Sequence, residues 1–331
     1  MLQNYWYRIT PLHLILLPLS LLFGLLAGLR RWLYRHGVLA SEALPVPVIV
    51  VGNISVGGSG KTPLTLWLTQ HLIENGWHPG IISRGYGGTA ATPQAVNPSS
   101  DPGEVGDEPL LMAQRALCPV WIGRNRPAVA RALLQAHPEC DVIVSDDGLQ
   151  HYRLQRTVEI AVVDGARRYG NGLLLPAGPL REPVSRLNSV DVVIMHGAAP
   201  AAGQYGMQLL GERFYNLLNP AITAQAADFS GQNLHAIAGI GHPQRFFAHL
   251  SRLGLTVHGH PFPDHHRYSC ADLIYDQADA LFMTEKDAVK CAQLFNQENG
   301  SPEKCWVLRV DAQLDPALLH SILERIAPNG R

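Results

Sequence analysis

A glycine-rich segment near the start of the chain carries residues suited to phosphate chemistry. It runs from residue 52 to residue 62 and reads GNISVGGSGKT, between an apolar run and a predicted helix over Lys61–Asn75. Glycines let consecutive backbone N–H groups turn toward one anion, and the N-terminus of a helix adds partial positive charge. We therefore expect nucleotide phosphates to be bound by Gly57, Gly58, Ser59 and Gly60, with Lys61 reaching the β- and γ-phosphates and Thr62 binding Mg²⁺.

The segment departs from the common phosphate-binding pattern at one position. Ser55 stands where the first glycine of GxxxxGK[ST] belongs. A glycine-rich turn that binds no ligand is the alternative interpretation. The flanking strand and helix favour the phosphate-binding interpretation, because this is the context in which such a loop works.

Two carboxylates follow a second apolar run. Asp141–Ser145 is a predicted strand, with the apolar run from Val142, and Asp146 and Asp147 come directly after it. Ligands of open α/β sheets bind at the carboxyl ends of the strands, so these side chains are expected near the glycine-rich loop. One of them would bind Mg²⁺ directly or through water. In the alternative interpretation, one of them caps a turn that Gly148 completes.

Three further groups are less specific. Asp107, in the GDEP sequence, is either a catalytic residue or an ordinary helix cap followed by Pro109. Arg181 and Glu182 follow a proline- and glycine-rich loop, where they could meet a triphosphate or an acceptor. The third group is compatible with a metal site, a base with an orienting partner, or a polar loop, and consists of His258, His260, Asp264, His265 and His266.

The elements that must position these residues alternate between short apolar runs and helical segments. Runs rich in Val and Ile, separated by helices, predict an α/β fold with a mostly parallel sheet covered by helices on both faces. We expect an N-terminal membrane-associated helix over 1–36, a P-loop domain over 37–200, a smaller α/β domain over 201–312, and a C-terminal helix over 313–331 that folds back on the first domain.

The N-terminal part contains 18 residues without formal charge, Leu12–Leu29. As a helix this stretch would be roughly 27 Å long, enough to cross a bilayer core. Arg30, Arg31 and Arg35 follow it, and the positive-inside rule then places the rest of the chain in the cytoplasm. Spanning and interfacial arrangements both remain open, beside a cleaved signal peptide and a buried core helix.

Composition excludes several classes of protein. The 331 residues are 47% hydrophobic and only 16% charged, which excludes a disordered or fibrous chain. With 26 basic and 27 acidic residues the net charge is −1, so no nucleic-acid partner is expected. The five cysteines form no CxxC pair, which indicates reduced thiols and no disulfide framework.

Together the motifs resemble the tetraacyldisaccharide 4′-kinase family of lipid A biosynthesis. The resemblance runs through nearly the whole chain, and Ser55 is usual in that family. Its marks, besides the N-terminal segment, are GNISVGGSGKTP (52–63), SRGYGG (83–88), GDEP (106–109), GRNR (123–126), DDGLQH (146–151), LPAGPLREP (175–183), GIGHPQRF (239–246), FPDHH (262–266) and TEKDAVK (284–290).

The resemblance implies an activity and roles for residues. The family transfers the γ-phosphate of ATP to the 4′-hydroxyl of a tetraacyl glucosamine disaccharide 1-phosphate, and the product is lipid IVA. Asp107 would be the catalytic base and His265 its partner, with His266 the less secure alternative. Lys61 and Thr62 keep their loop roles, and Asp146, Asp147 and Glu182 would surround Mg²⁺–ATP. The implied location is the cytoplasmic face of the bacterial inner membrane.

Two other classes compete with this interpretation. A P-loop GTPase that delivers metal would use the histidine-rich stretch 258–266, but the sequence offers no convincing guanine-reading NKxD motif. A membrane-tethered regulatory module would bind ATP without lipid-dependent turnover. Nucleotide preference and metal content separate the first of these from a lipid kinase.

Overall fold

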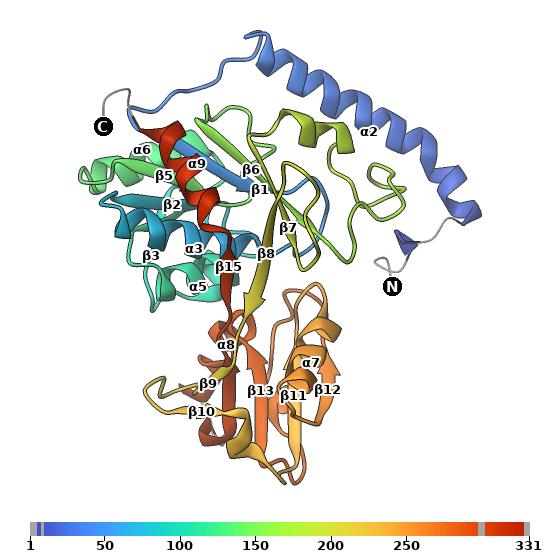
Figure 1. Cartoon of the computed structure of the whole chain (residues 1–331), viewed down its shortest axis with the longest axis vertical. Coiled ribbons are helices and arrows are strands. Elements are labelled where there is room, and N and C mark those ends of the chain that lie inside the picture. Colours follow the sequence, from blue (N-terminus) through green and yellow to red (C-terminus); the bar gives the residue numbers. More distant parts are fainter. Residues whose placement is uncertain (1–4, 8–9, 297–301, 328–331) are drawn as a thin grey trace.

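Two β-sheets and their helices make up most of the chain. In the computed structural model, residues 5–7, 10–296 and 302–327 are described. Figure 1 shows a larger upper part, which contains the first sheet, and a smaller lower part, which contains the second. The predicted α/β fold class is confirmed.

The larger sheet has nine strands, and its centre is parallel. Strand β1 pairs in parallel with both β5 and β6. The order across the sheet is β15 (Asp311–Leu314), β8 (Tyr205–Leu210), β7 (Val192–His196), β6 (Val158–Asp164), β1 (Val48–Gly52), β5 (Val142–Ser145), β2 (Pro79–Ser83), β4 (Val120–Ile122) and β3 (Gln94–Val96).

Helices cover both faces of this sheet, as side chains of β1 illustrate. Ile49 and Val51 pack in one buried cluster with helices α3 (Lys61–Glu74) and α9 (Pro316–Ile326). Val48 and Val50 point to the opposite face, where α6 (Arg126–Ala136) lies. Alternate residues of a strand face opposite sides of a sheet, so a strand buried on both faces is apolar throughout.

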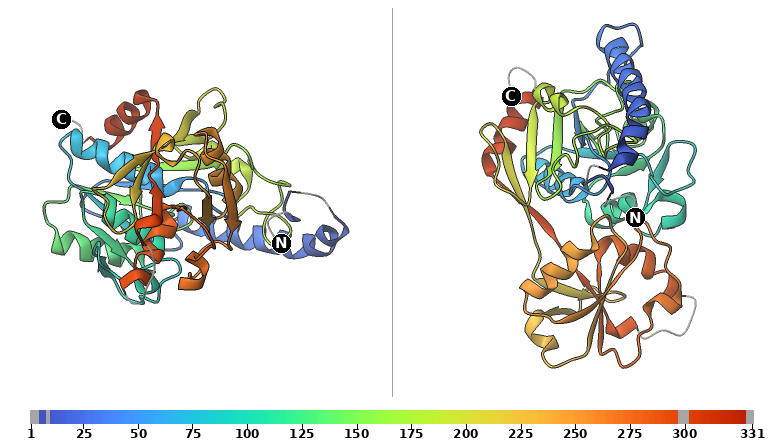
Figure 2. Two further views of the ribbon diagram at one scale, coloured as in Figure 1. Left: turned by 90° about the horizontal axis from the view of Figure 1, so that it is seen from below. Right: turned by 90° about the vertical axis from the view of Figure 1, so that its right-hand side faces the viewer.

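The smaller sheet has six strands and an aromatic core. Strands β11, β12, β13 and β14 run parallel, and β9 and β10 add to one edge antiparallel. The order is β10 (Thr223–Gln225), β9 (Arg213–Asn216), β14 (Cys305–Leu308), β13 (Ala280–Thr284), β11 (Leu234–Ala238) and β12 (Val257–Pro261). Helices α7 (Pro243–Arg252) and α8 (Glu285–Cys291) accompany it. Figure 2 shows this sheet and its helices as a separate layered body.

Two strands connect the parts and divide the chain differently from the predicted ranges. The boundaries at 200 and 312 assign all of β8 and the start of β15 to the second domain, but both strands pair within the larger sheet. They lie antiparallel to each other and run side by side between the two parts (Figure 1). Backbone hydrogen bonds between segments about 100 residues apart decide this pairing, and composition does not reveal them.

Helix α2 (Pro11–Arg35) lies along the larger part. Among the described residues it is the one helix long and apolar enough to cross a membrane, a property shared with some core helices and signal sequences. Only 11% of its most apolar window is buried, so the buried-core-helix alternative does not hold. Ser20 contacts the body at mid-helix, where its Oγ donates to Leu174 O at 3.0 Å and accepts from Ala177 N at 2.9 Å.

Two shorter helices complete the larger part. They are α4 (Pro102–Val105) and α5 (Asp107–Arg115), and α5 packs against α8 of the smaller part. Helix α8 ends at Cys291, and a 3₁₀ turn at Leu294–Asn296 follows it. Contacts between α5 and α8 bring the sequences GDEP and TEKDAVK together.

Candidate active site

The glycine-rich loop connects the end of β1 to the start of α3. Gly57 and Gly60 have φ values of 102° and 94°, a backbone region that side chains rarely adopt. A Cβ at residue 60 would lie 2.9 Å from His196 Nδ1, so space as well as conformation requires glycine there. Lys61 follows as the first residue of α3.

Side chains from neighbouring strand ends hold this loop in shape. Asn53 Nδ2 donates to Ser59 Oγ at 3.1 Å, and His196 at the end of β7 hydrogen-bonds Ser59 O through Nδ1 at 2.9 Å. Arg167, which follows β6, donates to Gly58 O. These contacts fix carbonyl groups of the loop, which leaves its N–H groups available for an anion.

Asp147 lies at the end of β5 and faces the loop lysine. Its Oδ1 is 3.5 Å from Lys61 Nζ, and Arg181 Nη1 is 3.3 Å from both of its oxygens. Burial works to raise the pKa of Asp147, but the charges of Lys61 and Arg181 bring it well below its usual range. Asp147 therefore stays ionised and is held by two cations.

Asp146 has a different environment one residue earlier. It is buried, Oδ1 accepts a hydrogen bond from Thr65 Oγ1 at 3.3 Å, and Oδ2 has no partner. Burial and the nearby charge of Glu108 raise the pKa of Asp146 to about 7. A buried carboxylate oxygen without a partner is an unusual cost, which a cation bound there would remove.

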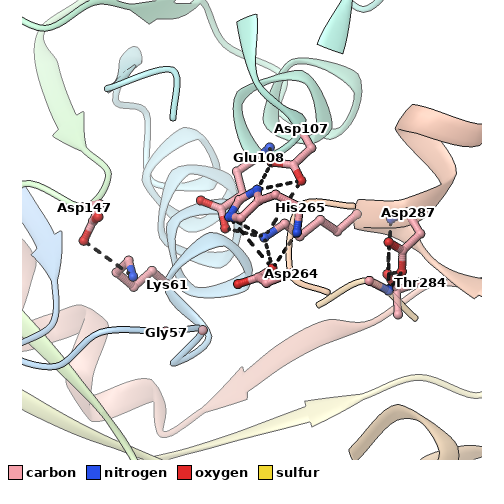
Figure 3. Close-up of polar contacts among 12 residues, drawn as sticks. Gly57, Lys61, Asp107, Glu108, Asp147, Asp264, His265, Thr284 and Asp287 are labelled. Atoms are coloured by element: carbon pink, nitrogen blue, oxygen red, sulfur yellow. Dashed lines mark hydrogen bonds and ion pairs between the residues drawn. The ribbon is translucent and has the colours of Figure 1, made fainter. Parts of the chain in front are cut away.

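The second group of candidate catalytic residues, Asp107 and His265, comes from both parts of the molecule. His265 Nδ1 is 3.1 Å from Asp107 Oδ1 and 3.0 Å from Oδ2 (Figure 3). Asp107 is the first residue of α5, and His265 lies in the loop after β12. His265 has a φ of 58° although it is not glycine. Such backbone strain persists only where surrounding contacts hold it.

The Asp107–His265 contact changes the acidity of both groups. Burial works to raise the pKa of Asp107, but the hydrogen bond from His265 and the charge of Lys286 bring it below its ordinary value. Burial works in the opposite direction on His265, and its hydrogen bond with Asp107 raises the pKa of the imidazole. The arrangement is a buried carboxylate supported by a histidine, which is a geometry suited to proton abstraction.

Two other predicted site residues, Glu182 and His266, lie away from the Asp107–His265 contact. Glu182 is buried and accepts from Gln150 Nε2 at 2.7 Å and from the Tyr152 hydroxyl. His266 turns toward Asp272, with Nε2 3.5 Å from Oδ2, so His265 and not His266 contacts Asp107.

The histidines of the stretch 258–266 therefore lie in different places and do not form one site. His258 and His260 lie on β12 beside His235 and take no part in the contact with Asp107. In the part of the chain that the structure describes, no three His, Cys, Asp or Glu side chains are grouped to hold a metal ion.

A cavity of about 610 Å³ extends from the phosphate loop to Glu108 and Lys286, which lie beside the Asp107–His265 contact. Its walls come from the glycine-rich loop and from both parts of the molecule, and include Ser59, Lys61, Glu108, Gly241, Arg245 and Lys286. A Cβ at residue 241 would lie 3.2 Å from the backbone nitrogen of Gly58, so the smaller part reaches the phosphate loop directly.

Sequence reasoning gave no role to two of these residues, although their motifs were part of the resemblance. Lys286 of TEKDAVK lies 3.1 Å from Glu108 Oε1, and Arg245 of GIGHPQRF lies 2.8 Å from Asp164 Oδ1. Both ion pairs join the smaller part to the larger one. The motifs themselves were the only signal that could have pointed to them.

Comparisons with known proteins agree on one family. The sequence profile of Tetraacyldisaccharide-1-P 4'-kinase (LpxK) matches residues 12–327. The tetraacyldisaccharide 4'-kinase of Azoarcus sp. is 55% identical, with 98% of this chain and 94% of that protein covered. That of Methylobacillus flagellatus is 52% identical, with coverages of 98% and 95%. A crystal structure of LpxK from Aquifex aeolicus in complex with ATP is 28% identical, covers 96% of this chain and 100% of its own, and gives a TM-score of 0.79.

Proposed function

Because this chain belongs to the tetraacyldisaccharide 4′-kinase family, we propose that it transfers the γ-phosphate of ATP to the 4′-hydroxyl of a tetraacyl disaccharide 1-phosphate. The product is lipid IVA, the bisphosphorylated precursor of lipid A. The observation that carries the proposal is the Asp107–His265 contact, which lies beside Glu108 and Lys286, two residues that line the same cavity as the phosphate loop.

Different residues of the site bind the phosphates, accept the proton and orient the base. Backbone N–H groups of residues 57–60 and the Lys61 ammonium bind the phosphates and offset the charge that develops during transfer. Asp107 accepts the proton of the 4′-hydroxyl. The 4′-oxygen then bonds to the γ-phosphorus as the bond from that phosphorus to the bridging oxygen breaks, and ADP leaves. His265 orients the Asp107 carboxylate.

The site also fits a magnesium ion beside the nucleotide. Thr62 is the second residue of the helix after the loop, and the unpartnered Oδ2 of Asp146 supplies the hard oxygen that Mg²⁺ prefers. Asp147 is already held by Lys61 and Arg181, so it would support the magnesium site from beside Asp146. Glu182 supports this edge of the sheet through Gln150. Bound Mg²⁺ would neutralise phosphate charge during transfer.

We infer that α2 lies in the membrane interface and does not span the bilayer. Three points along it are fixed to the larger part: Ser20 at Leu174, Arg30 at Gln150 O (3.1 Å) and Arg31 at Ser189 Oγ (2.7 Å). A spanning helix would draw that body into hydrocarbon, where polar groups are costly. The opposite face is apolar and exposed, with Leu14, Ile15, Leu21 and Leu25 each at 68–71%.

This arrangement suits a substrate that stays in the membrane. A four-chain glycolipid leaves a bilayer with difficulty, at roughly 0.8 kcal/mol per buried CH₂ group. Arg30, Arg31 and Arg35 follow the apolar stretch and would attract anionic headgroups. Since the phosphate donor is ATP, the proposed location is the cytoplasmic face of the bacterial inner membrane.

The metal-delivering GTPase is not supported, because relatives and structural neighbour alike are kinases of this family. Transfer of label from γ-labelled ATP to detergent-dispersed tetraacyl disaccharide 1-phosphate, with Mg²⁺, tests the proposed function. We expect label in the lipid with the wild-type enzyme and its loss in Asp107→Ala, while ATP binding persists. ATP binding without any labelled lipid would overturn the substrate assignment.

A further inference from the structure

The segment 284–290, TEKDAVK, carries four charged residues that the proposed reaction has not used. Three of them, Glu285, Lys286 and Lys290, form ion pairs with α5 of the other part. Lys286 Nζ lies 3.1 Å from Glu108 Oε1, and Glu285 Oε2 lies 3.0 Å from Arg115 Nη1. Asp287 instead stays within the smaller part and holds the backbone nitrogen of Gly239.

Lys286 reaches both members of the Asp107–His265 pair, while Lys290 approaches Asp107, with its Nζ 3.9 Å from Oδ2. Lys286 Nζ is 3.4 Å from His265 Nε2, 3.9 Å from Asp107 Oδ2 and 3.2 Å from Asp264 Oδ1. The Lys286 side chain is only 16% exposed. Burial works against the charged form, but the carboxylates of Glu108, Asp107 and Asp264 raise the pKa of Lys286 above its ordinary value. The group is therefore a fixed cation.

This placement favours one tautomer of the neutral imidazole. An ammonium group only donates hydrogen bonds, so its contact with Nε2 of a neutral His265 favours that nitrogen as the unprotonated acceptor. The proton of a neutral His265 then lies on Nδ1, where it donates to Asp107. Without the ammonium group, either ring nitrogen could carry the proton, and a proton on Nε2 would leave Nδ1 as an acceptor facing a carboxylate.

We propose that Lys286 is a positioning residue for phosphoryl transfer, which sets the tautomer of His265 and joins the smaller part to α5 through Glu108. This inference rests on the proposed function. The charged groups that contact His265 are Asp107 on α5, Asp264 in its own loop and Lys286 on α8, and behind them Glu108 pairs with Lys286 and Lys290 with Asp107. The Tyr86 ring lies 5.0 Å from the imidazole, between ring centres.

The test compares Lys286→Met with Lys286→Arg in the full-length enzyme, by kcat and KM across pH. Lys286 lowers the pKa of both Asp107 and His265, so its removal favours their protonated forms. We expect kcat of Lys286→Met to fall by about tenfold or more, with KM for ATP nearly unchanged. The acidic limb of its rate profile should move to higher pH by about one unit. Lys286→Arg keeps the charge, and its limb should stay at the wild-type position.

The matched control is Arg115→Met. It removes a different ion pair between α5 and α8, Arg115–Glu285, but no charge beside His265, so the pH of the acidic limb should not move. Lys286→Gln takes the place of the methionine variant if that variant does not fold. An unchanged limb in a folded, uncharged variant, with wild-type transfer intact, would overturn the role of Lys286 alone. No transfer by the wild-type enzyme would overturn the proposed function, and this inference with it.

Discussion

His265 Nδ1 and Asp107 Oδ2 lie 3.0 Å apart although 158 residues separate them in the chain. One begins a helix of the larger part, and the other lies in a strained loop of the smaller part. A carboxylate and its partner from different parts of the molecule come together only when those parts are close. The proposed base is thus complete only while the two parts keep this arrangement.

Replacing the carboxylate should remove the base and leave nucleotide binding intact. Asp107→Asn keeps the size of the side chain but cannot accept the hydroxyl proton, so kcat should fall by about 10² or more. Binding of a non-hydrolysable ATP analogue, measured by calorimetry, should change little. His265→Gln should cost less than Asp107→Asn, because histidine orients the carboxylate. An Asp107→Asn enzyme with normal turnover would refute the assignment.

Gly60→Ala should abolish nucleotide binding. Alanine would have to adopt a φ of 94°, and its Cβ would lie 2.9 Å from His196 Nδ1. Gly76→Ala is the matched control, because Gly76 has a φ of 80° but nothing within 4 Å of the added atom. The control should lose about 1 kcal/mol of stability from strain and keep its affinity for ATP. Equal affinities in the two variants would show that the loop tolerates a side chain.

The stabilisation from the Asp107–His265 contact should depend on pH. The pKa of His265 is raised above its ordinary value of 6.5, so its contribution is complete below that value and is lost as pH rises through the raised pKa. The pKa of Asp107 is lowered, so its contribution is complete above 3.8 and is lost as pH falls through the lowered pKa.

Both contributions coexist between those two ordinary values. The difference in Tm between wild type and His265→Gln should therefore be largest near pH 5–6, by this linkage, and should shrink toward pH 9. Thermal unfolding of the detergent-solubilised protein across this range measures it. A difference that grows with pH would contradict the assigned pKa directions.

The exposed face of α2 should bind lipid. In Leu21→Glu/Leu25→Glu, two exposed leucines become charged, and binding to vesicles containing anionic lipid should weaken by at least tenfold, since each buried leucine contributes about 1.5–3 kcal/mol. Cosedimentation with vesicles measures the effect. Leu117→Glu is the control, because Leu117 is 86% exposed but lies after α5 and not on α2. Equal losses in both variants would argue against a specific membrane face.

Local sequence determined the elements that carry the chemistry. The phosphate-binding prediction for residues 52–62 depended only on adjacent residues, because glycine conformation, a preceding strand and a following helix N-terminus are all local properties. The same holds for Asp146 and Asp147 at the end of an apolar strand. Strands β8, β9 and β10 escaped prediction because they are short and partly exposed, with no apolar run to mark them.

The tertiary structure decided which distant groups meet. The sequence by itself placed Asp107 before a helix and His265 in a polar stretch, but it left His266 as an alternative and gave Lys286 no role. Burial, charge and hydrogen bonding act between atoms a few ångströms apart, whatever the distance along the chain. The contact of His265 with Asp107 and the ammonium group at His265 Nε2 are therefore properties of the fold, and packing of α5 against α8 brings Lys286 to this place. The unpartnered Oδ2 of Asp146 is likewise set by the fold, which buries that carboxylate beside Thr65 of α3.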